Sequence, residues 1–253
     1  MKVVILAGGF GTRLSELTHS IPKPMVEVGN IPLIFHIMNH YSKFQHCEFI
    51  IATGYKSDYV KKYFLDYMNT KDDFSIDMKN NSIKKFNEHS LDWKVSVIDT
   101  GLHTMTGGRI KKLARYLEGE DFLLTYGDGL SNVPIDKTID QFYRNKKKLL
   151  MTCVRPPARF GEVIVDNEDV LSFQEKPQLN EGWINGGFFV CKNSILNYIE
   201  SDDEMFERQP MEKICKDKEL TAFKHEGFWQ CMDSIKDHNK LCSMWDSGNP
   251  PWK

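Results

Sequence analysis

Short, almost wholly apolar runs alternate with longer amphipathic stretches over the first 155 residues. The runs lie at residues 3–7, 48–53, 94–99, 121–126 and 149–154. Runs without polar alternation are typical of strands that are buried on both faces of a parallel sheet. The stretches between them place apolar residues at helical spacing. The pattern therefore predicts an α/β fold with a doubly wound, mainly parallel, Rossmann-like sheet.

Several of the intervening stretches carry residues that begin or end helices. Residues 33–44 place apolar side chains on one face, and Pro32 suits a first helical turn. Ser57 is expected to cap the next helix. Thr106 is expected to lie directly ahead of a further helix that stops before Gly119. We expect helices over these three stretches.

The pattern changes after about residue 155 to short alternating runs. They lie at 162–165, 170–175, 186–191 and 220–225, with helical patterns near 193–200, 205–217 and 233–246 between them. No linker rich in proline, glycine and serine and no internal repeat divides the chain. We therefore expect one domain over residues 1–253 with a mixed sheet. The polar segment 71–90 is weakly patterned and predicts an inserted hairpin or loop.

Composition excludes some classes of function. The chain has 253 residues, 33 basic and 35 acidic, and a formal net charge of -2, so a nucleic-acid partner is not expected. No run approaches the ~20 apolar residues of a membrane span, so we expect no membrane partner and a cytoplasmic location. Six cysteines without a CxxC pair indicate neither a zinc site nor a disulfide framework. We expect most of them to be small core residues.

A glycine-rich turn follows the first apolar run. It contains Gly8, Gly9 and Gly11. Such a turn presents backbone N–H groups to an anion, although many such turns are only structural. The spacing is neither the dinucleotide fingerprint nor a P-loop, which argues against a nicotinamide oxidoreductase. Thr12 and Arg13, with Lys23 held between two prolines, favour a phosphate site.

At this point the chain resembles a known family, the sugar-1-phosphate nucleotidyltransferases. LAGGFGTRL followed by PKPM is similar to the family signature, and the similarity continues in order through DTGLHTMTGGRIKK, TYGDG, RFGEV, FQEKP, INGGFFV, GFWQCMD and PPWK. The set is most similar to the glucose-1-phosphate cytidylyltransferases. The resemblance implies the nucleotidyltransferase fold and the reaction of CTP with glucose 1-phosphate to give CDP-glucose and pyrophosphate, for dideoxysugar and O-antigen-type polysaccharide biosynthesis.

The resemblance also implies a set of site residues and a division of labour. Residues 1–155 would mainly bind nucleotide and residues 156–253 mainly sugar phosphate. The implied catalytic residues are Arg13, Lys23 and Asp128. The implied nucleotide-binding residues are Leu6, Ala7, Gly8, Gly9, Gly11, Thr12, Arg13, Lys23, Thr106, Gly107, Gly108, Arg109 and Gly127. The implied sugar-phosphate-binding residues are Gly161, Glu175, Lys176, Asn185 and Gly186, and the implied Mg²⁺ ligands are Asp128 and Asp233.

Several of these residues also have a purely structural interpretation. Asp128 follows an expected strand, where a ligand site is typical but a turn or helix cap is common. Asp233 could cap a helix that begins near Ser234. Gly161 and Gly186 could mark turns or bulges in strand pairs.

Arg109 allows a hypothesis about the base. Cytosine offers the acceptors O2 and N3, whereas N3 of uracil carries a hydrogen, and arginine can only donate. If Arg109 or a nearby donor faces N3, cytosine is preferred, because uracil would leave two donors opposed and desolvated. A solvated helix position or a phosphate contact are the alternatives.

The implied chemistry requires charge neutralisation and not a general base. A phosphate monoester with a second pKa near ~6 is already mostly dianionic at neutral pH. Arg13, Mg²⁺ and the glycine-turn amides would hold the triphosphate, Lys23 would stabilise the α-phosphoryl group, and Lys176 would position the attacking phosphate. Phe10, Glu162 and Cys231 depart from the family pattern. Another pyrimidine triphosphate, another sugar 1-phosphate, or a non-catalytic sugar-nucleotide-binding regulator remain alternatives, and we expect a homo-oligomer.

Overall fold

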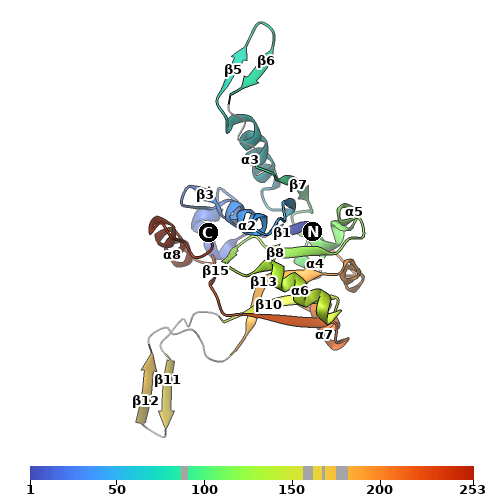
Figure 1. The fold of residues 1–253 in the computed structure, drawn as a ribbon, viewed down its shortest axis with the longest axis vertical. Helices are drawn as coiled ribbons and strands as arrows, with labels where there is room; N and C mark the ends of the chain where they lie inside the picture. The colour runs from blue at the N-terminus through green and yellow to red at the C-terminus, as the bar shows by residue number, and fades with distance from the viewer. Residues whose placement is uncertain (87–90, 156–161, 167–168, 175–181) are drawn as a thin grey trace.

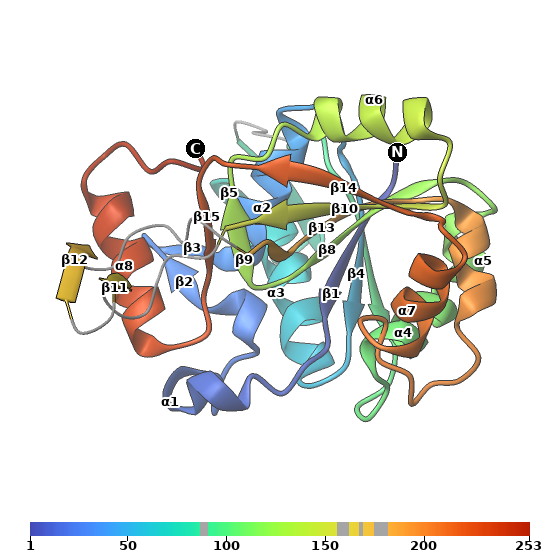
Figure 2. The same cartoon turned by 90° about the horizontal axis from the view of Figure 1, so that it is seen from below.

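A seven-stranded sheet forms the centre of the molecule (Figure 1 and Figure 2). The computed structural model describes residues 1–86, 91–155, 162–166, 169–174 and 182–253. The strand order is β14-β10-β13-β8-β1-β4-β7. The strands are β1 (Val3–Ala7), β4 (Glu48–Thr53), β7 (Lys94–Asp99), β8 (Phe122–Tyr126), β10 (Leu149–Val154), β13 (Ile184–Cys191) and β14 (Leu220–His225). Neighbouring strands are parallel except in the two pairs that include β13, which confirms the expected mainly parallel, mixed sheet.

The side chains of β1 show why its sequence lacks polar alternation. Val3 and Ile5 pack into one apolar cluster, whereas Val4 and Leu6 pack into a second cluster on the other face. All four are buried. The first cluster includes side chains of α2 (Leu33–Ser42), α3 (Ser57–Thr70), α6 (Ile135–Asn145) and α8 (Ile235–Asp246). The second includes side chains of α4 (Thr106–Lys112), α5 (Ala114–Leu117), η3 (Asn193–Tyr198) and α7 (Gln209–Lys216). Both faces of the sheet are therefore covered, as a doubly wound fold requires.

Strands from both parts of the chain build this one sheet. β13 lies between β8 and β10 and is antiparallel to both, with Phe188 opposite Thr125 on β8. β14 adds to the outer side of β10 in a parallel pair. The strand runs that precede residue 155 and the runs at 186–191 and 220–225 thus share one hydrogen-bonded sheet.

Short elements and hairpins complete the fold. Near the N-terminus lie η1 (Thr12–Leu14), α1 (Ser15–Thr18), η2 (Lys23–Met25), β2 (Glu27–Val28) and β3 (Ile31–Pro32). The remaining strands form three antiparallel pairs, β5 (Phe74–Asp77) with β6 (Ser82–Lys85), β9 (Gly129–Ser131) with β15 (Trp229–Cys231), and β11 (Glu162–Asp166) with β12 (Asp169–Gln174). The β5–β6 hairpin extends beyond α3 at one end of the molecule (Figure 1). It confirms the hairpin expected within 71–90, of which residues 87–90 lie outside the described part.

Two predicted helix starts are wrong in detail. Ser57 is the first residue of α3 and not its cap, because its hydroxyl lies 2.8 Å from Thr53 Oγ1 and Lys56 takes the cap position with a left-handed φ of 52°. Thr106 is the first residue of α4 and does not lie ahead of it. The expected single helix before Gly119 is divided into α4 and α5 at Leu113.

The later helices also differ from their patterns. The stretch near 193–200 forms the 3-10 helix η3, and α7 covers only the second part of 205–217. α8 begins at Ile235, with Ser234 as its cap. The Ser234 side chain accepts from the Asp237 N–H and the Asp237 carboxylate accepts from the Ser234 N–H, a reciprocal capping box. Asp233 is therefore not the helix cap.

The cysteines and the helices bear on the remaining global expectations. All six cysteines are free, but only Cys153 and Cys191 are buried, and Cys215 is exposed. The expectation that most of them are core residues is therefore wrong. Within the described ranges, no helix is both long enough and apolar enough to cross a membrane.

Candidate active site

A cleft of about 1700 Å³ lies where β1 and β8 end. Ligands in open α/β sheets bind beyond the carboxyl ends of parallel strands. Gly8 follows β1, Gly127 follows β8, and Asn185 stands near the start of the reversed strand β13, and all three line the cleft. The sheet thus brings together segments that are far apart in the sequence.

Most of the expected site residues that the structure describes meet at this cleft. Those that line it are Leu6, Ala7, Gly8, Gly9, Gly11, Thr12, Arg13, Lys23, Thr106, Arg109, Gly127, Asp128, Asn185, Gly186 and Asp233. Gly161, Glu175 and Lys176 lie outside the described residues. The expected contributions of these three to a sugar-phosphate site therefore stay predictions.

Gly107 and Gly108 do not line the cleft, and their expected role in nucleotide binding stays a prediction. The N–H groups of both donate to the carbonyl of Glu204, at 2.9 and 3.4 Å. A Cβ on Gly107 would lie 2.7 Å from that carbonyl, and one on Gly108 would lie 2.5 Å from the carbonyl of Asp202. The two glycines let the start of α4 approach the 202–206 segment closely.

Arg109 is buried beneath the glycine turn. Its Nη2 donates to the carbonyl of Gly8 (2.9 Å), and its Nη1 donates to the carbonyls of Thr53 (2.9 Å) and Gly101 (2.8 Å) and to the Thr100 hydroxyl (2.7 Å). Burial lowers the pKa of Arg109. A Cβ on Gly8 would lie 2.2 Å from the guanidinium carbon, so any side chain at position 8 would displace Arg109 from its hydrogen bonds. Arg109 therefore connects the loops that follow β1 and β7 with the last residue of β4.

The hypothesis that Arg109 donates to cytosine N3 is not supported by this arrangement. Both terminal nitrogens of its guanidinium already have protein acceptors. Arg109 is only 4% exposed, so the alternative of a solvated helix residue is wrong as well. Its position is that of a residue that holds the glycine turn in shape.

Lys23 connects the two aspartates of the site. Its Nζ lies 2.7 Å from Asp128 Oδ2 and 2.6 Å from Asp233 Oδ1. The lysine opens η2 between two prolines, which restrict its backbone. Its side chain is 11% exposed, and the two aspartates are about one-quarter exposed. Asp128 directly precedes β9, so the alternative of a helix cap is wrong for it.

Arg13 completes the charged cluster from the solvent side. Its Nη1 lies 2.6 Å from Asp233 Oδ2, and its side chain is 75% exposed. Burial lowers the pKa of Lys23, but the neighbouring carboxylates of Asp128 and Asp233 outweigh that effect and raise it. Burial raises the pKa of Asp233, but Lys23 and Arg13 outweigh that effect and lower it. Both Lys23 and Asp233 are therefore charged at neutral pH.

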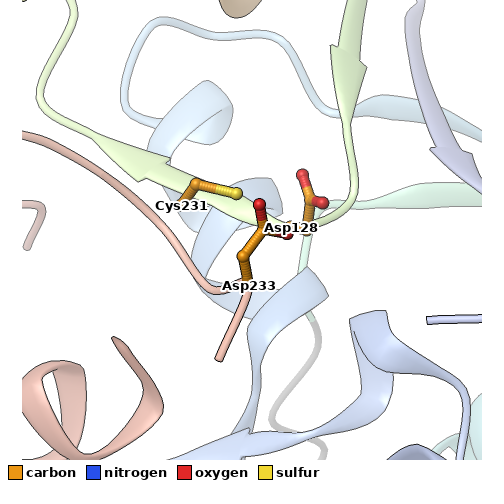
Figure 3. A group of neighbouring side chains, drawn as sticks. All are labelled: Asp128, Cys231 and Asp233. Carbon is orange, nitrogen blue, oxygen red and sulfur yellow. The ribbon is translucent and has the colours of Figure 1, made fainter. Parts of the chain in front are cut away.

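The two aspartates form a group that suits a hard divalent cation. Asp128, Cys231 and Asp233 point toward one another, with one ligand atom of each within 4.8 Å of the others (Figure 3). Two carboxylates that converge in a cleft have the oxygen donors that Mg²⁺ prefers. Burial raises the pKa of the Cys231 thiol, and a neutral thiol is a poor ligand for Mg²⁺. The donor set therefore fits Mg²⁺ through the aspartates and not through the cysteine.

A second polar network surrounds Asn185. Its Nδ2 donates to Tyr126 Oη (3.2 Å), and Tyr126 Oη donates to Glu207 (2.6 Å). The indole of Trp229 donates to the carbonyl of Gly186 (2.8 Å). A Cβ on Gly186 would lie 2.8 Å from a Val154 methyl. The absence of a side chain at Gly186 therefore lets β13 pack closely against β10.

Sequence reasoning did not find three polar residues that line this part of the cleft. Tyr126 and Trp229 lie in strands and read as ordinary strand formers, and Glu207 lies in the turn before α7. Tyr126 and Trp229 lie within the motifs TYGDG and GFWQCMD, which carried a signal for them, whereas only its position in space identifies Glu207.

Comparison with known proteins gives the family. A profile of the nucleotidyl transferase family matches residues 2–239. The chain is 43% identical over 254 residues to the glucose-1-phosphate cytidylyltransferase of Salmonella typhi, covering 100% of this chain and 99% of that protein. It is 37% identical over 254 residues to a probable glucose-1-phosphate cytidylyltransferase of Bacillus subtilis, with the same coverage.

Solved structures show the same fold. The crystal structure of HddC from Yersinia pseudotuberculosis, complexed with GMP-PN, has a TM-score of 0.70 and 25% identity, and covers 96% of this chain and 99% of that one. The structure of an apo UDP-glucose pyrophosphorylase has a TM-score of 0.70 and 16% identity, with 98% of each chain covered. These matches agree with the resemblance carried by the glycine turn and the later motifs. The chain belongs to the nucleotidyl transferase family.

Proposed function

We propose that this chain transfers the cytidylyl group of CTP to α-D-glucose 1-phosphate, giving CDP-glucose and pyrophosphate. The observation that carries the proposal is the cluster of Lys23, Asp128 and Asp233 in the cleft beside the glycine turn. The choice of cytosine and glucose is supported by the name and the 43% identity of the Salmonella typhi relative, which is matched over its whole length. We extend the proposal to the supply of CDP-glucose for dideoxysugar and O-antigen-type polysaccharide biosynthesis.

The cluster suits a reaction between two anions. The attacking group is a phosphate oxygen, which is already mostly deprotonated at neutral pH, so the chain needs no general base. The barrier lies in holding two anions in line and in stabilising charge on the α-phosphorus and on the departing pyrophosphate. Lys23, fixed by its prolines and by Asp128 and Asp233, supplies a preorganised positive charge.

Arg13 has the opposite character, because its side chain is mostly exposed. It is able to turn from Asp233 toward an entering triphosphate at small cost, since an exposed ion pair contributes little stability. A Cβ added at Gly9 would have no other atom within 4 Å. This open space leaves room for the triphosphate next to the backbone of Gly9. Asp128 and Asp233 would hold Mg²⁺, which supplies further neutralisation of the triphosphate when bound.

The sugar phosphate would bind on the side of Asn185 and Gly186. We keep Gly161, Glu175 and Lys176 as proposed contributors there on the strength of the family motifs that contain them. On this assignment one domain carries both binding functions, with the nucleotide mainly on residues 1–155 and the sugar phosphate mainly on 156–253.

We also propose that the chain works as a homo-oligomer in the cytoplasm. Large apolar side chains are exposed along the arm formed by α3, β5 and β6, at Leu65, Met68, Phe74, Ile76 and Ile83. Apolar surface of this kind is typical of an interface. The six free cysteines suit a reducing compartment. Light scattering of the purified chain tests the oligomer, and a monomeric mass at micromolar concentration would contradict it.

A pyrophosphate-release assay tests the activity. The purified chain is incubated with Mg²⁺ and each combination of CTP, UTP, dTTP, GTP or ATP with glucose 1-phosphate, mannose 1-phosphate or galactose 1-phosphate. We expect CTP with glucose 1-phosphate to give the highest kcat/KM. Faster turnover of another pair would correct the substrates but keep the reaction class. Binding of CDP-glucose without turnover of any pair would favour the non-catalytic regulator.

A further inference from the structure

Glu207 is a cleft residue that no motif of the family resemblance includes. It lies in the turn before α7, and its carboxylate accepts two short hydrogen bonds. Tyr126 Oη donates to Oε1 at 2.6 Å, and Thr106 Oγ1 donates to Oε2 at 2.6 Å. Hydrogen bonds to a charged acceptor are shorter and stronger than those between neutral groups. Glu207 is therefore hydrogen-bonded at the same time to β8, through Tyr126, and to α4, through Thr106.

The two donors belong to separate parts of the proposed site. Thr106 begins α4, the helix that carries Arg109. Its hydroxyl also accepts from the Phe206 N–H at 2.8 Å. The Thr106 hydroxyl therefore both donates to and accepts from the turn that carries Glu207. Tyr126 ends β8, two residues before Asp128. Glu207 thus joins the helix that supports the glycine turn to the strand that leads to the proposed metal ligand.

The hydroxyl of Tyr126 passes this connection on to Asn185. Because its proton is directed at Glu207, its oxygen is free to accept from Asn185 Nδ2, at 3.2 Å. Asn185 Oδ1 in turn accepts from the Gly187 N–H at 2.8 Å, which sets the orientation of the amide. The direction of each hydrogen bond in this chain is thereby fixed.

We propose that Glu207 is a positioning residue that orients Asn185 toward the sugar phosphate through Tyr126. The inference rests on the proposed function, because it takes Asn185 as part of the sugar-phosphate side. Glu207 itself touches no reacting group on this view. The ring of Tyr126 is held by packing, with Phe189 at 5.7 Å between ring centroids and Gly187 where a Cβ would lie 2.5 Å from the ring. Only the direction of its hydroxyl therefore depends on Glu207.

The test is a double-mutant cycle between Glu207→Gln and Tyr126→Phe. Both changes keep side-chain shape, and KM for each substrate and kcat are measured by pyrophosphate release. We expect each single variant to raise KM for the sugar 1-phosphate by about 5- to 20-fold, the usual effect of losing one buried hydrogen-bond partner, with KM for the nucleotide changed by less than about 2-fold. The double variant should resemble the worse single variant, since Glu207 acts through Tyr126.

Glu212→Gln is the matched control, because Glu212 is an exposed residue of α7 and does not line the cleft. Thermal unfolding of every variant identifies a folding defect, and Asn185→Asp with an intact Glu207 should show the same selective rise in KM. Equal rises in both KM values, no rise in either, or additive effects in the double variant would overturn the inference.

The assay uses whichever nucleotide and sugar 1-phosphate turn over fastest, so a wrong choice of substrate under the proposed function leaves this test intact. If no pair turns over, the dissociation constant of CDP-glucose measured by calorimetry replaces KM in the same cycle. An unchanged dissociation constant in both single variants would then overturn the role of Glu207, whereas the absence of turnover counts only against the proposed activity.

Discussion

Replacing Lys23 with alanine removes the positive charge that Asp128 and Asp233 share. The Lys23 ammonium lies 2.7 and 2.6 Å from the two carboxylates, and its side chain is only 11% exposed. Water that enters the variant would not supply the positive charge that is lost. Loss of one preorganised electrostatic stabiliser typically lowers turnover by ~100-fold or more, which corresponds to about 2.7 kcal/mol of transition-state stabilisation. We therefore expect kcat for pyrophosphate release to fall by at least ~100-fold.

The same variant should bind Mg²⁺ more tightly when nucleotide is absent. In the wild type the lysine competes for both carboxylates and repels a second cation close by. Two unit charges at about 4 Å interact by about 1 kcal/mol in water and about 4 kcal/mol at an effective dielectric constant of 20. Even the lower figure predicts a rise in Mg²⁺ affinity of about 5-fold, measured by isothermal titration calorimetry.

Opposite changes in the two measurements distinguish a catalytic lysine from a structural one. Lys23→Arg keeps the charge and should keep part of the activity, and Lys216→Ala removes an exposed lysine of α7 as the matched control. Turnover within about 5-fold of the wild type in a folded Lys23→Ala protein would refute the catalytic role. An unchanged or weaker Mg²⁺ affinity would refute the idea that the lysine and the cation share the aspartates.

Three further predictions concern two arginines that line the cleft and a buried histidine of α2. Arg13→Ala should raise KM for CTP about 10-fold but change the free energy of unfolding by less than ~1 kcal/mol, because its ion pair is exposed; a large fall in the melting temperature would contradict this. Arg109→Ala should lower the free energy of unfolding by about 3 kcal/mol and the melting temperature by about 6 to 12 °C, since several buried acceptors lose their donor; an unchanged melting temperature with a loss of CTP over UTP preference would restore the base hypothesis. Burial lowers the pKa of His40 to about 4 from 6.5, and its Nδ1 has no hydrogen-bond partner among the described residues. As the pH falls below 6.5, the unfolded chain binds a proton at His40 before the folded protein does. The contribution of His40 to the free energy of unfolding is therefore fully present above pH 6.5, and up to about 3 kcal/mol of it is lost as the pH drops toward 4. Urea unfolding of His40→Gln should show a shallower pH dependence over this range than the wild type.

Local patterns were sufficient for the parts of this fold that depend on burial. The run at residues 3–7 predicts a strand buried on both faces because each side chain in it must find an apolar layer. The glycine turn and Lys23 were also predictable, because their chemistry is local to the chain: glycines that free the backbone, and two prolines that restrict it.

Long-range partners decide the features that the sequence did not predict. Ser57 has the residue type of a helix cap, but its hydroxyl is taken by Thr53. Gly107 and Gly108 are glycines because the 202–206 segment presses against α4, and nothing near them in the sequence indicates that segment. No local pattern indicates Glu207, because its proposed role depends on hydrogen bonds from Thr106 and Tyr126, which are distant in the sequence.

The reversed direction of β13 determines where Asn185 lies in the proposed two-anion site. A strand parallel to β8 would bring its carboxyl end to the cleft and leave Asn185 at the far edge of the sheet. With β13 reversed, the register that places Phe188 opposite Thr125 puts Asn185 beyond the end of β8, where its side chain meets that of Tyr126. The separation between the sugar side and Asp128 is therefore set by backbone hydrogen bonds between adjacent strands. On the proposed assignment, both phosphates bind along the edge of one sheet, and the pairing of its strands sets where each of them lies.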